Sequence, residues 1–212
     1  MRNLLIASAA LALAACGAAT AQSDAPVSAV VDAPSGAYVN DLAHTSVLWK
    51  IRHMGLSDYT SRITGAQIEL DFDAQNIEKS RVRATIDASS FDAFYPGTDK
   101  DFNEEIESPL IMNAAEFATI TFVSTSVVKT SPKTADITGD LTMMGVTKPV
   151  TLIATYHGST SEHPFAKVPA IGFNAHATID RTEFGNTFLS KEGILGDMVT
   201  IQIEAEFIKK SQ

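Results

Sequence analysis

Apolar and polar side chains alternate along most of this chain, and this alternation constrains the fold more than any other feature of the sequence. The segment DITGDLTMMGVTKPVT, residues 136–151, shows it most clearly. Its first apolar positions are Ile137, Gly139, Leu141 and Met143. A period of two is typical of a strand with one buried face and one wet face. Because Gly145 and Pro149 interrupt the run before the alternation resumes, the segment predicts a β-hairpin whose apolar face points inward.

Six further segments alternate in the same way, which brings the number of expected strands to eight. They are residues 47–53, 66–72, 82–88, 120–122, 171–179 and 199–207. Strands with one apolar face and short connections favour an all-β, antiparallel architecture. The simplest arrangement of eight such strands is a closed, lipocalin-like β-barrel, because closure removes exposed sheet edges. A sandwich of two sheets is the alternative.

One segment, DKDFNEEIESPLIMNAA at residues 99–115, departs from this pattern. Phe102 and Ile106 have helical spacing, and acidic residues near its start favour the positive end of a helix dipole. Pro109 predicts a break into two short helices. Such a segment can cap or plug one end of a barrel, with its acidic side chains forming a solvated face rather than a site.

Residues of very different size fall on the inward face of the expected strands. The small ones are Ala66, Ala84, Ala88, Gly139, Ala154, Ala175, Ala177 and Ala205, and the large ones are Phe72, Phe122, Leu141, Phe173 and Phe207. An eight-stranded barrel is either filled by its own side chains or holds one small or slender ligand. Two interpretations therefore stay open at this point: an elongated apolar slot, or a solid core in which the large residues fill the gaps.

The N-terminus is typical of a secretory signal peptide within residues 1–21. Arg2 precedes an apolar run, residues 4–15, that is too short to span a bilayer. Cleavage is expected either before Cys16, in the sequence LAAC, or after Ala21. Cys16 is the only cysteine of the chain, and exported domains rarely keep a lone thiol, so lipidation of Cys16 is the favoured interpretation.

The remaining chain divides into a linker and one domain. Residues 17–36 are rich in Ala, Ser, Asp and Pro and have no apolar period, which predicts a flexible linker. Residues 37–209 form the expected barrel domain. We expect a periplasmic protein that is either soluble or attached to a membrane through lipidated Cys16.

Charge and motifs exclude several classes of function. The formal net charge is -9, with 16 basic and 25 acidic residues, so nucleic acid is not an expected partner. The five histidines include no HExxH motif, and the sequence contains no GxSxG, phosphate-binding loop or dinucleotide fingerprint. The sequence therefore predicts no catalytic residue, metal site or cofactor, and we expect a protein that is not an enzyme.

Seven segments together carry a resemblance to a known family. They are HTSVLWKIRHMGLS (residues 44–57), a glycine at 65, DFDAQNI (71–77), ITFVSTSV (120–127), ITGDLTMMGVTKPVTL (137–152), IGFNAHATIDRTEFG (171–185) and GDMVTIQIEAEF (196–207). Over residues 37–209 the chain resembles the YceI-like family. The resemblance implies an exported, lipocalin-like barrel whose tubular interior holds a polyisoprenoid or another long-chain amphiphile.

The inward position in the alternating pattern, which we call parity, and the resemblance together identify eight candidate ligand-binding residues. Six are expected to form an apolar wall: Trp49, Ile51, Phe122, Leu141, Met143 and Phe173. His53 either donates a hydrogen bond to a ligand head group or anchors the following turn. Arg181 either pairs with Asp180 or faces a phosphate group.

The expected function is non-enzymatic binding, with transport or storage, of such an amphiphile in the bacterial cell envelope. The alternative is a structural or protein-interaction barrel with a solid core. A hydrolase of a bound lipid would need a cluster of polar residues at one end of the barrel, and the sequence reveals none.

Overall fold

The computed structural model describes residues 33–97 and 99–211. The predicted signal peptide, Cys16 and most of the predicted linker lie outside the described residues.

The described residues form ten strands, one α-helix and two short 3-10 helices. In chain order these are β1 (Gly36–His53), β2 (Ser57–Ile63), β3 (Ala66–Phe72), η1 (Ile77–Lys79), β4 (Arg81–Asp87), β5 (Phe91–Asp92), α1 (Phe102–Glu107), β6 (Thr119–Lys129), β7 (Thr134–Met143), β8 (Val146–Thr160), β9 (Ala170–Asp180), η2 (Arg181–Phe184) and β10 (Leu195–Lys209). No helix among the described residues is both long enough and apolar enough to cross a membrane.

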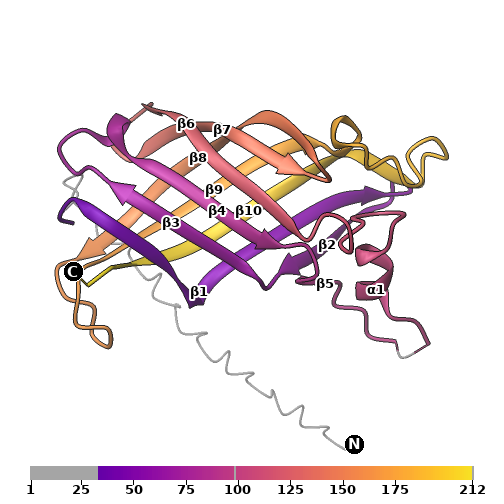
Figure 1. Ribbon diagram of the computed structural model, residues 1–212, viewed down its shortest axis with the longest axis horizontal. Coiled ribbons are helices and arrows are strands. Elements are labelled where there is room, and N and C mark those ends of the chain that lie inside the picture. The colour runs from indigo at the N-terminus through magenta and orange to yellow at the C-terminus, as the bar shows by residue number, and fades with distance from the viewer. Residues whose placement is uncertain (1–32, 98, 212) are drawn as a thin grey trace, which may run out of the picture.

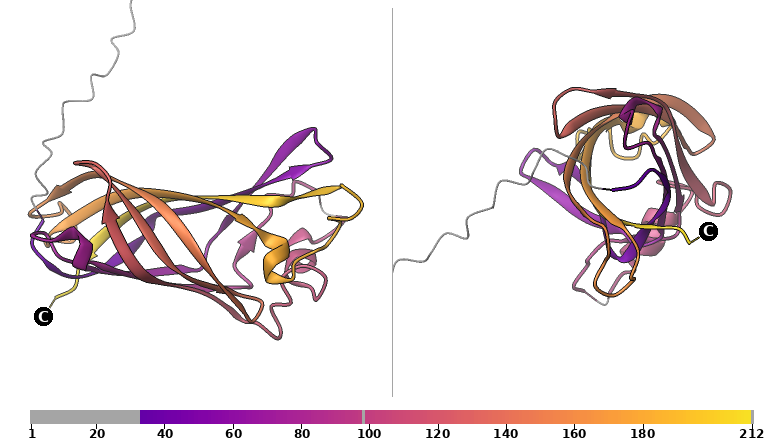
Figure 2. Two further views of the ribbon diagram at one scale, coloured as in Figure 1. Left: turned by 90° about the horizontal axis from the view of Figure 1, so that it is seen from above. Right: turned by 90° about the vertical axis from the view of Figure 1, so that its left-hand side faces the viewer.

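Eight of the strands close into an antiparallel barrel, as the sequence predicts (Figures 1 and 2). The ring runs β1, β3, β4, β6, β7, β8, β9, β10, and β10 pairs with β1 to complete it. Every pairing is antiparallel. Each strand of the ring has a hydrogen-bonded neighbour on both sides, so closure leaves none of them as an edge strand. The alternative of a two-sheet sandwich is not observed.

The predicted hairpin at residues 136–151 is confirmed as β7 and β8. Met143 pairs with Val146, which leaves only Met144 and Gly145 in the turn. Both have positive φ, 51° and 73°, the conformation that two-residue hairpin turns need to match the twist of their strands. Gly145 is therefore required by the geometry of this turn.

Strands β2 and β5 are not among the strands expected from the sequence. Strand β1 is long enough to pair with β3 near its start and with β2 over Val47–His53. Strand β2 in turn pairs with the short β5. The sheet next to β1 thus divides in two, and the end of the barrel beside β2 and β5 is built from loops and α1 (Figure 1).

The two ends of the barrel differ in what covers them (Figure 1). At the end that we call the α1 end lie the β1–β2 and β7–β8 turns, the segment 93–118 with α1, and the loop 181–194. At the opposite end, the η1 end, lie η1, the β6–β7 turn (residues 130–133), and the loop 161–169. The described chain also begins and ends there.

The helical segment at the α1 end is confirmed only in part. Asp101 caps α1, because its carboxylate accepts hydrogen bonds from the backbone N–H of Asn103 and Glu104 at 2.9 and 3.2 Å. Ile106 is buried against the barrel. The expected second helix after Pro109 is wrong: residues 109–112 form turns, in which the N–H of Met112 bonds back to the carbonyl of Ile106.

Buried apolar residues gather in two clusters toward opposite ends of the barrel. The cluster at the α1 end includes Ile106, Leu141 and Phe184. The cluster at the η1 end includes Phe72 and Phe207. Ala84 packs against both clusters, and the inward residues around it, such as Val82, Ile201 and Ile203, are only half-buried.

Candidate functional site

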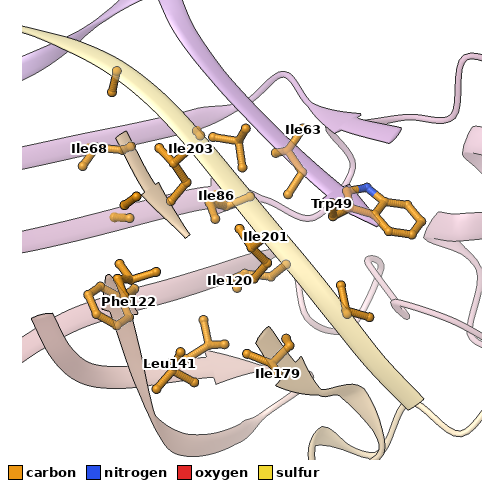
Figure 3. Close-up of a pocket in the computed structure, with 18 of the residues that line it drawn as sticks. Trp49, Ile63, Ile68, Ile86, Ile120, Phe122, Leu141, Ile179, Ile201 and Ile203 are labelled. Atoms are coloured by element: carbon orange, nitrogen blue, oxygen red, sulfur yellow. The ribbon is translucent and has the colours of Figure 1, made fainter. Parts of the chain in front are cut away.

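An elongated cavity of about 850 Å³ occupies the interior of the barrel (Figure 3). All eight strands of the ring contribute to its wall, and so do β2, β5 and α1. The lining reaches from Lys133 at the η1 end to Leu189 at the α1 end. Its volume falls within the range of small-molecule binding sites in proteins.

The middle of the cavity is lined by side chains that face inward and yet remain accessible. Val82, Ala84 and Ile86 on β4 and Ile201 and Ile203 on β10 are only half-buried, although each belongs to the inward face of its strand. In a close-packed core such residues would be fully covered. Their remaining accessible surface faces the cavity, so the interior of this barrel is not the solid core of the alternative interpretation.

The shape and chemistry of the wall suit a long apolar chain. Val199 and Phe207 both line the cavity and lie on one strand, eight residues apart, which corresponds to about 26 Å along β10. Most lining side chains between them and across the barrel are aliphatic or aromatic (Figure 3). A slender apolar molecule can therefore contact the wall along its length without any polar partner.

The interior is full at one place, beside Gly139. A Cβ atom at this position would overlap Cζ of Phe122 and would lie 2.6 Å from the carbonyl oxygen of Val123. Glycine thus lets the Phe122 ring lie directly against β7, where a larger residue would push it away. Phe122 and Gly139 together set the width of the cavity at this level.

The structure brings all six predicted wall residues to the cavity. They are Trp49 and Ile51 on β1, Phe122 on β6, Leu141 and Met143 on β7, and Phe173 on β9. Their contact with a ligand remains a prediction.

Trp49 belongs to an aromatic group at the α1 end of the cavity. Its ring centroid lies 6.0 Å from that of Tyr59 and 5.9 Å from that of Phe91. The Tyr59 hydroxyl donates to the carbonyl of Ala93 at 2.5 Å, and burial raises the pKa of this hydroxyl, with the charge of Asp92 as a smaller cause. Tyr59 and Phe91 are not among the residues expected from the sequence, because β2 and β5 are not among the expected strands. The signal for β2 was the alternation of Tyr59, Ser61 and Ile63 with polar neighbours.

His53 lies at the α1 end of β1, where it is exposed and lines the mouth of the cavity. The turn that follows is closed by its backbone, whose carbonyl accepts from the N–H of Leu56 at 2.9 Å. Its imidazole makes no hydrogen bond to any described residue. A contact with a ligand head group remains a prediction.

Arg181 lies under the loop at the α1 end and is only 3% exposed. Its Nε donates to the carbonyl of Gly196 at 2.9 Å, its Nη1 to the carbonyl and Oδ1 of Asn186 at 3.0 and 2.8 Å, and its Nη2 to the carbonyl of Leu195 at 3.2 Å. Burial lowers the pKa of this guanidinium, and the charges of Asp197 and Asp180 oppose that shift.

The ion pair between Arg181 and Asp180 that the sequence left open is not formed. The carboxylate of Asp180 instead accepts from the backbone N–H and the hydroxyl of Thr182 at 2.9 and 2.6 Å. The guanidinium N–H groups of Arg181 donate to protein oxygens, and these hydrogen bonds hold the loop over the α1 end. Arg181 also borders the cavity. Its contact with a ligand stays a prediction.

Acidic, histidine and cysteine side chains do not converge anywhere in residues 33–97 and 99–211 in a group of three or more that could hold a metal ion. What the cavity offers is its elongated shape and its mainly apolar wall.

Three comparisons place this architecture among known proteins. Residues 38–207 match the model of the YceI-like domain. A UPF0312 protein of Pseudomonas fluorescens is 35% identical over 167 residues, which cover 79% of this chain and 82% of the relative. Among solved structures, Burkholderia cenocepacia BcnA aligns with a TM-score of 0.68 at 21% identity and covers 79% of this chain and 98% of its own.

A polyisoprenoid binding domain from Saccharophagus degradans, implicated in plant cell wall breakdown, aligns with a TM-score of 0.60 at 9% identity, covering 83% of this chain and 99% of its own. At such identities the two solved structures establish a shared fold.

Proposed function

The chain belongs to the YceI-like family, and from that premise we propose that it binds a polyisoprenoid or another long-chain amphiphile, without catalysis, and transports or stores it in the bacterial cell envelope. The single observation that carries the proposal is the elongated apolar cavity of about 850 Å³. The description of the Saccharophagus degradans domain as polyisoprenoid-binding supports the same class of ligand.

Burial of the apolar chain supplies the binding free energy in this proposal. Removing apolar surface from water contributes roughly 25 cal/mol per Å², so a chain that buries about 400 Å² gains on the order of 10 kcal/mol before the cost of association. No directional group is needed along the tail, which agrees with the aliphatic and aromatic wall. Met143 can adapt its flexible side chain to an irregular tail.

The envelope location rests on the signal peptide that the sequence predicts. An exported binding protein can shield a water-insoluble chain while it crosses the aqueous space between membranes. Lipidation of Cys16 would keep the protein at a membrane, and cleavage after Ala21 would release it. The alternative, a structural or interaction barrel, requires a solid core, and the cavity inside this barrel argues against it.

Trp49 provides a direct test of binding. It is the only tryptophan of the chain and lines the cavity, so a bound chain should change its fluorescence. We expect titration of the ligand-free protein with geranylgeraniol to give a saturable change with one ligand per chain. Replacement Ala84→Phe, which adds a second ring next to Phe122 in the cavity wall, should abolish or strongly weaken this change.

The matched control is Thr85→Phe on the same strand, because Thr85 is exposed on the outer face of β4. It should bind as the wild type does. Absence of any saturable signal in the wild type, together with absence of a complex in native mass spectrometry, would overturn the proposed function. Equal binding by Ala84→Phe and the wild type would show that the cavity is not the site.

A further inference from the structure

Two lysines line the cavity at its η1 end. Lys129 is the last residue of β6 and pairs with Ala135, at the same inward parity as Val127 and Ile137, which pair with each other. Lys133 lies in the turn that follows and also lines the cavity. The other lining residues near this end are uncharged, and they include the polar Ser131 and Thr134 and the aromatic Tyr156.

The turn that carries Lys133 is fixed by hydrogen bonds. The hydroxyl of Ser131 accepts from the backbone N–H of Lys133 and of Thr134 at 3.2 and 3.1 Å. The carbonyl of Lys133 accepts from the N–H of Tyr156 on β8 at 2.7 Å, which ties the turn to the neighbouring strand. The main chain thus holds the bases of both lysine side chains at the rim of the cavity.

Neither lysine has a carboxylate partner within the part of the chain that the structure describes, whereas Lys167 and Lys210 form ion pairs with Glu162 and Glu69. Besides the two lysines, the cavity lining contains two charged residues, Arg181 and Glu105, and one histidine, His53. All three lie at the α1 end. Since the donors of Arg181 are directed at protein oxygens, the two lysines are the cations that a ligand in the cavity could reach.

Charge at the α1 end has the opposite sign. The segment 93–118, which covers that end, contains six acidic residues and one lysine, a net charge of -5. Glu105 from this segment lines the cavity itself. The long axis of the cavity therefore runs from a cationic rim at the η1 end to an acidic cover at the α1 end.

From this asymmetry we infer that the cavity takes an amphiphile with an anionic oxygen head group, a carboxylate or a phosphate, which Lys129 and Lys133 bind at the η1 end while the apolar chain extends toward α1. The inference rests on the proposed function and deepens it, because it assigns the head group and the direction of the ligand. Glu105 and its acidic neighbours disfavour the reverse orientation by repulsion of like charges.

Pairs of ligands that share a tail and differ in the head group test this inference. Geranylgeranyl phosphate is compared with geranylgeraniol, and oleate with oleyl alcohol, by Trp49 fluorescence at low ionic strength. Two partly solvated ion pairs should make each anion bind roughly tenfold more tightly than its alcohol. The preference should shrink in about 0.5 M salt, which screens the lysine charges. The two pairs separate phosphate from carboxylate recognition.

Variants then assign the preference to the two lysines. Lys129→Gln with Lys133→Gln, which removes both charges and leaves polar side chains, should bind anion and alcohol alike, and Lys129→Arg with Lys133→Arg should keep the preference. The control Lys79→Gln with Lys191→Gln removes the same charge at exposed positions outside the cavity and should behave as the wild type. Thermal unfolding checks that each variant is folded.

The outcomes separate the inference from the function on which it rests. Alcohols that bind as tightly as both anions, or a preference that survives the double glutamine variant, would overturn the head-group assignment and leave lipid binding intact. Failure of all four ligands to bind the wild type would overturn both.

Discussion

At the scale of single residues, a few buried contacts determine what the cavity can hold. Arg181 joins the carbonyl of Asn186, inside the loop at the α1 end, to the carbonyls of Leu195 and Gly196 at the start of β10. Gly139 admits the ring of Phe122, while Ala84 and Ile203 leave the middle of the barrel open. The first of these residues supports the cover of the cavity, and the others set its internal shape.

Replacement Arg181→Lys should destabilise the protein. A lysine cannot satisfy the acceptors of Gly196, Asn186 and Leu195 together, so buried carbonyls lose their partners, at a cost of about 3 kcal/mol. Urea unfolding measures the loss. Arg83→Lys, at an exposed position on β4, is the control and should change stability by less than about 0.5 kcal/mol. Equal effects of the two changes would contradict this account of Arg181.

Replacement Gly139→Ala should also be costly, because the new Cβ would meet the Phe122 ring and the Val123 carbonyl within 2.6 Å. Overpacking of this kind costs about 1–3 kcal/mol. The control is Gly158→Ala on β8, where a Cβ would have no atom within 4 Å. Thermal unfolding should separate the two variants, and a neutral Gly139→Ala would show that the ring moves aside freely.

Parity in the sequence was sufficient to place Trp49, Leu141 and Phe173 on the inner face, because side-chain direction in a strand follows from position alone. It could not place the partners of Arg181. Gly196 and Leu195 lie more than a dozen residues away, and their carbonyls meet the guanidinium only through the path of the loop. The Thr182 bonds that occupy Asp180 depend on the local 3-10 turn.

At the scale of elements, β1 organises the barrel. It pairs with β10 along one side and with β3 and then β2 along the other, so the ring opens toward the α1 end, where α1 and its flanking turns complete the wall. Ile106 and Met112 from this segment pack into the buried cluster at that end. On this side the cover of the cavity is therefore a short helix with its flanking turns, held by the buried side chains of Ile106 and Met112.

The N-cap of α1 should control the order of this cover. Asp101→Ala removes the acceptor of two backbone N–H groups, which should cost about 1 kcal/mol of local stability. Hydrogen exchange at residues 102–107 should quicken, while the barrel strands keep their protection. Asp101→Asn retains a capping oxygen and serves as the control. Unchanged exchange in Asp101→Ala would mean that packing of Ile106 alone fixes the helix.

Eight strands could be predicted because each alternates over several residues, and β5 could not because Phe91–Asp92 is too short to show a period. Strand β2 was missed because its buried middle residue, Ser61, is polar and satisfies its hydroxyl by donating to the carbonyl of Asp92. The second helix was predicted because Pro109 interrupts a segment in which Phe102 and Ile106 have helical spacing. Residues 109–112 form turns instead, and Met112 packs into the buried cluster at the α1 end.

At the scale of the whole molecule, the barrel combines packed ends with an open middle. Alternation in the sequence distinguishes inside from outside, but it says nothing of the distance between opposite walls. Whether the small inward residues face large partners across the barrel depends on the shape of the closed ring, so the cavity could only emerge from the structure. The YceI-like resemblance supplied the expectation of a tube, and the cavity agrees with it.

Occupation of the cavity should stabilise the whole barrel. A ligand that binds only the folded state adds about 2.7 kcal/mol at a free concentration one hundred times its Kd. Geranylgeraniol should therefore raise the unfolding temperature of the ligand-free protein in a concentration-dependent way. Ala84→Phe should show no such rise, and Thr85→Phe should show the full one. A ligand-independent unfolding temperature in the wild type would contradict binding inside the barrel.

The central claim, that this barrel carries a long-chain amphiphile, is tested most directly by native mass spectrometry of the protein purified from its own host without detergent. We expect a species heavier than the protein chain by the mass of one amphiphile, which organic extraction removes and releases for identification. Repeated preparations that show only the mass of the protein, and that stay bare after incubation with isoprenoid and fatty-chain ligands, would contradict the claim.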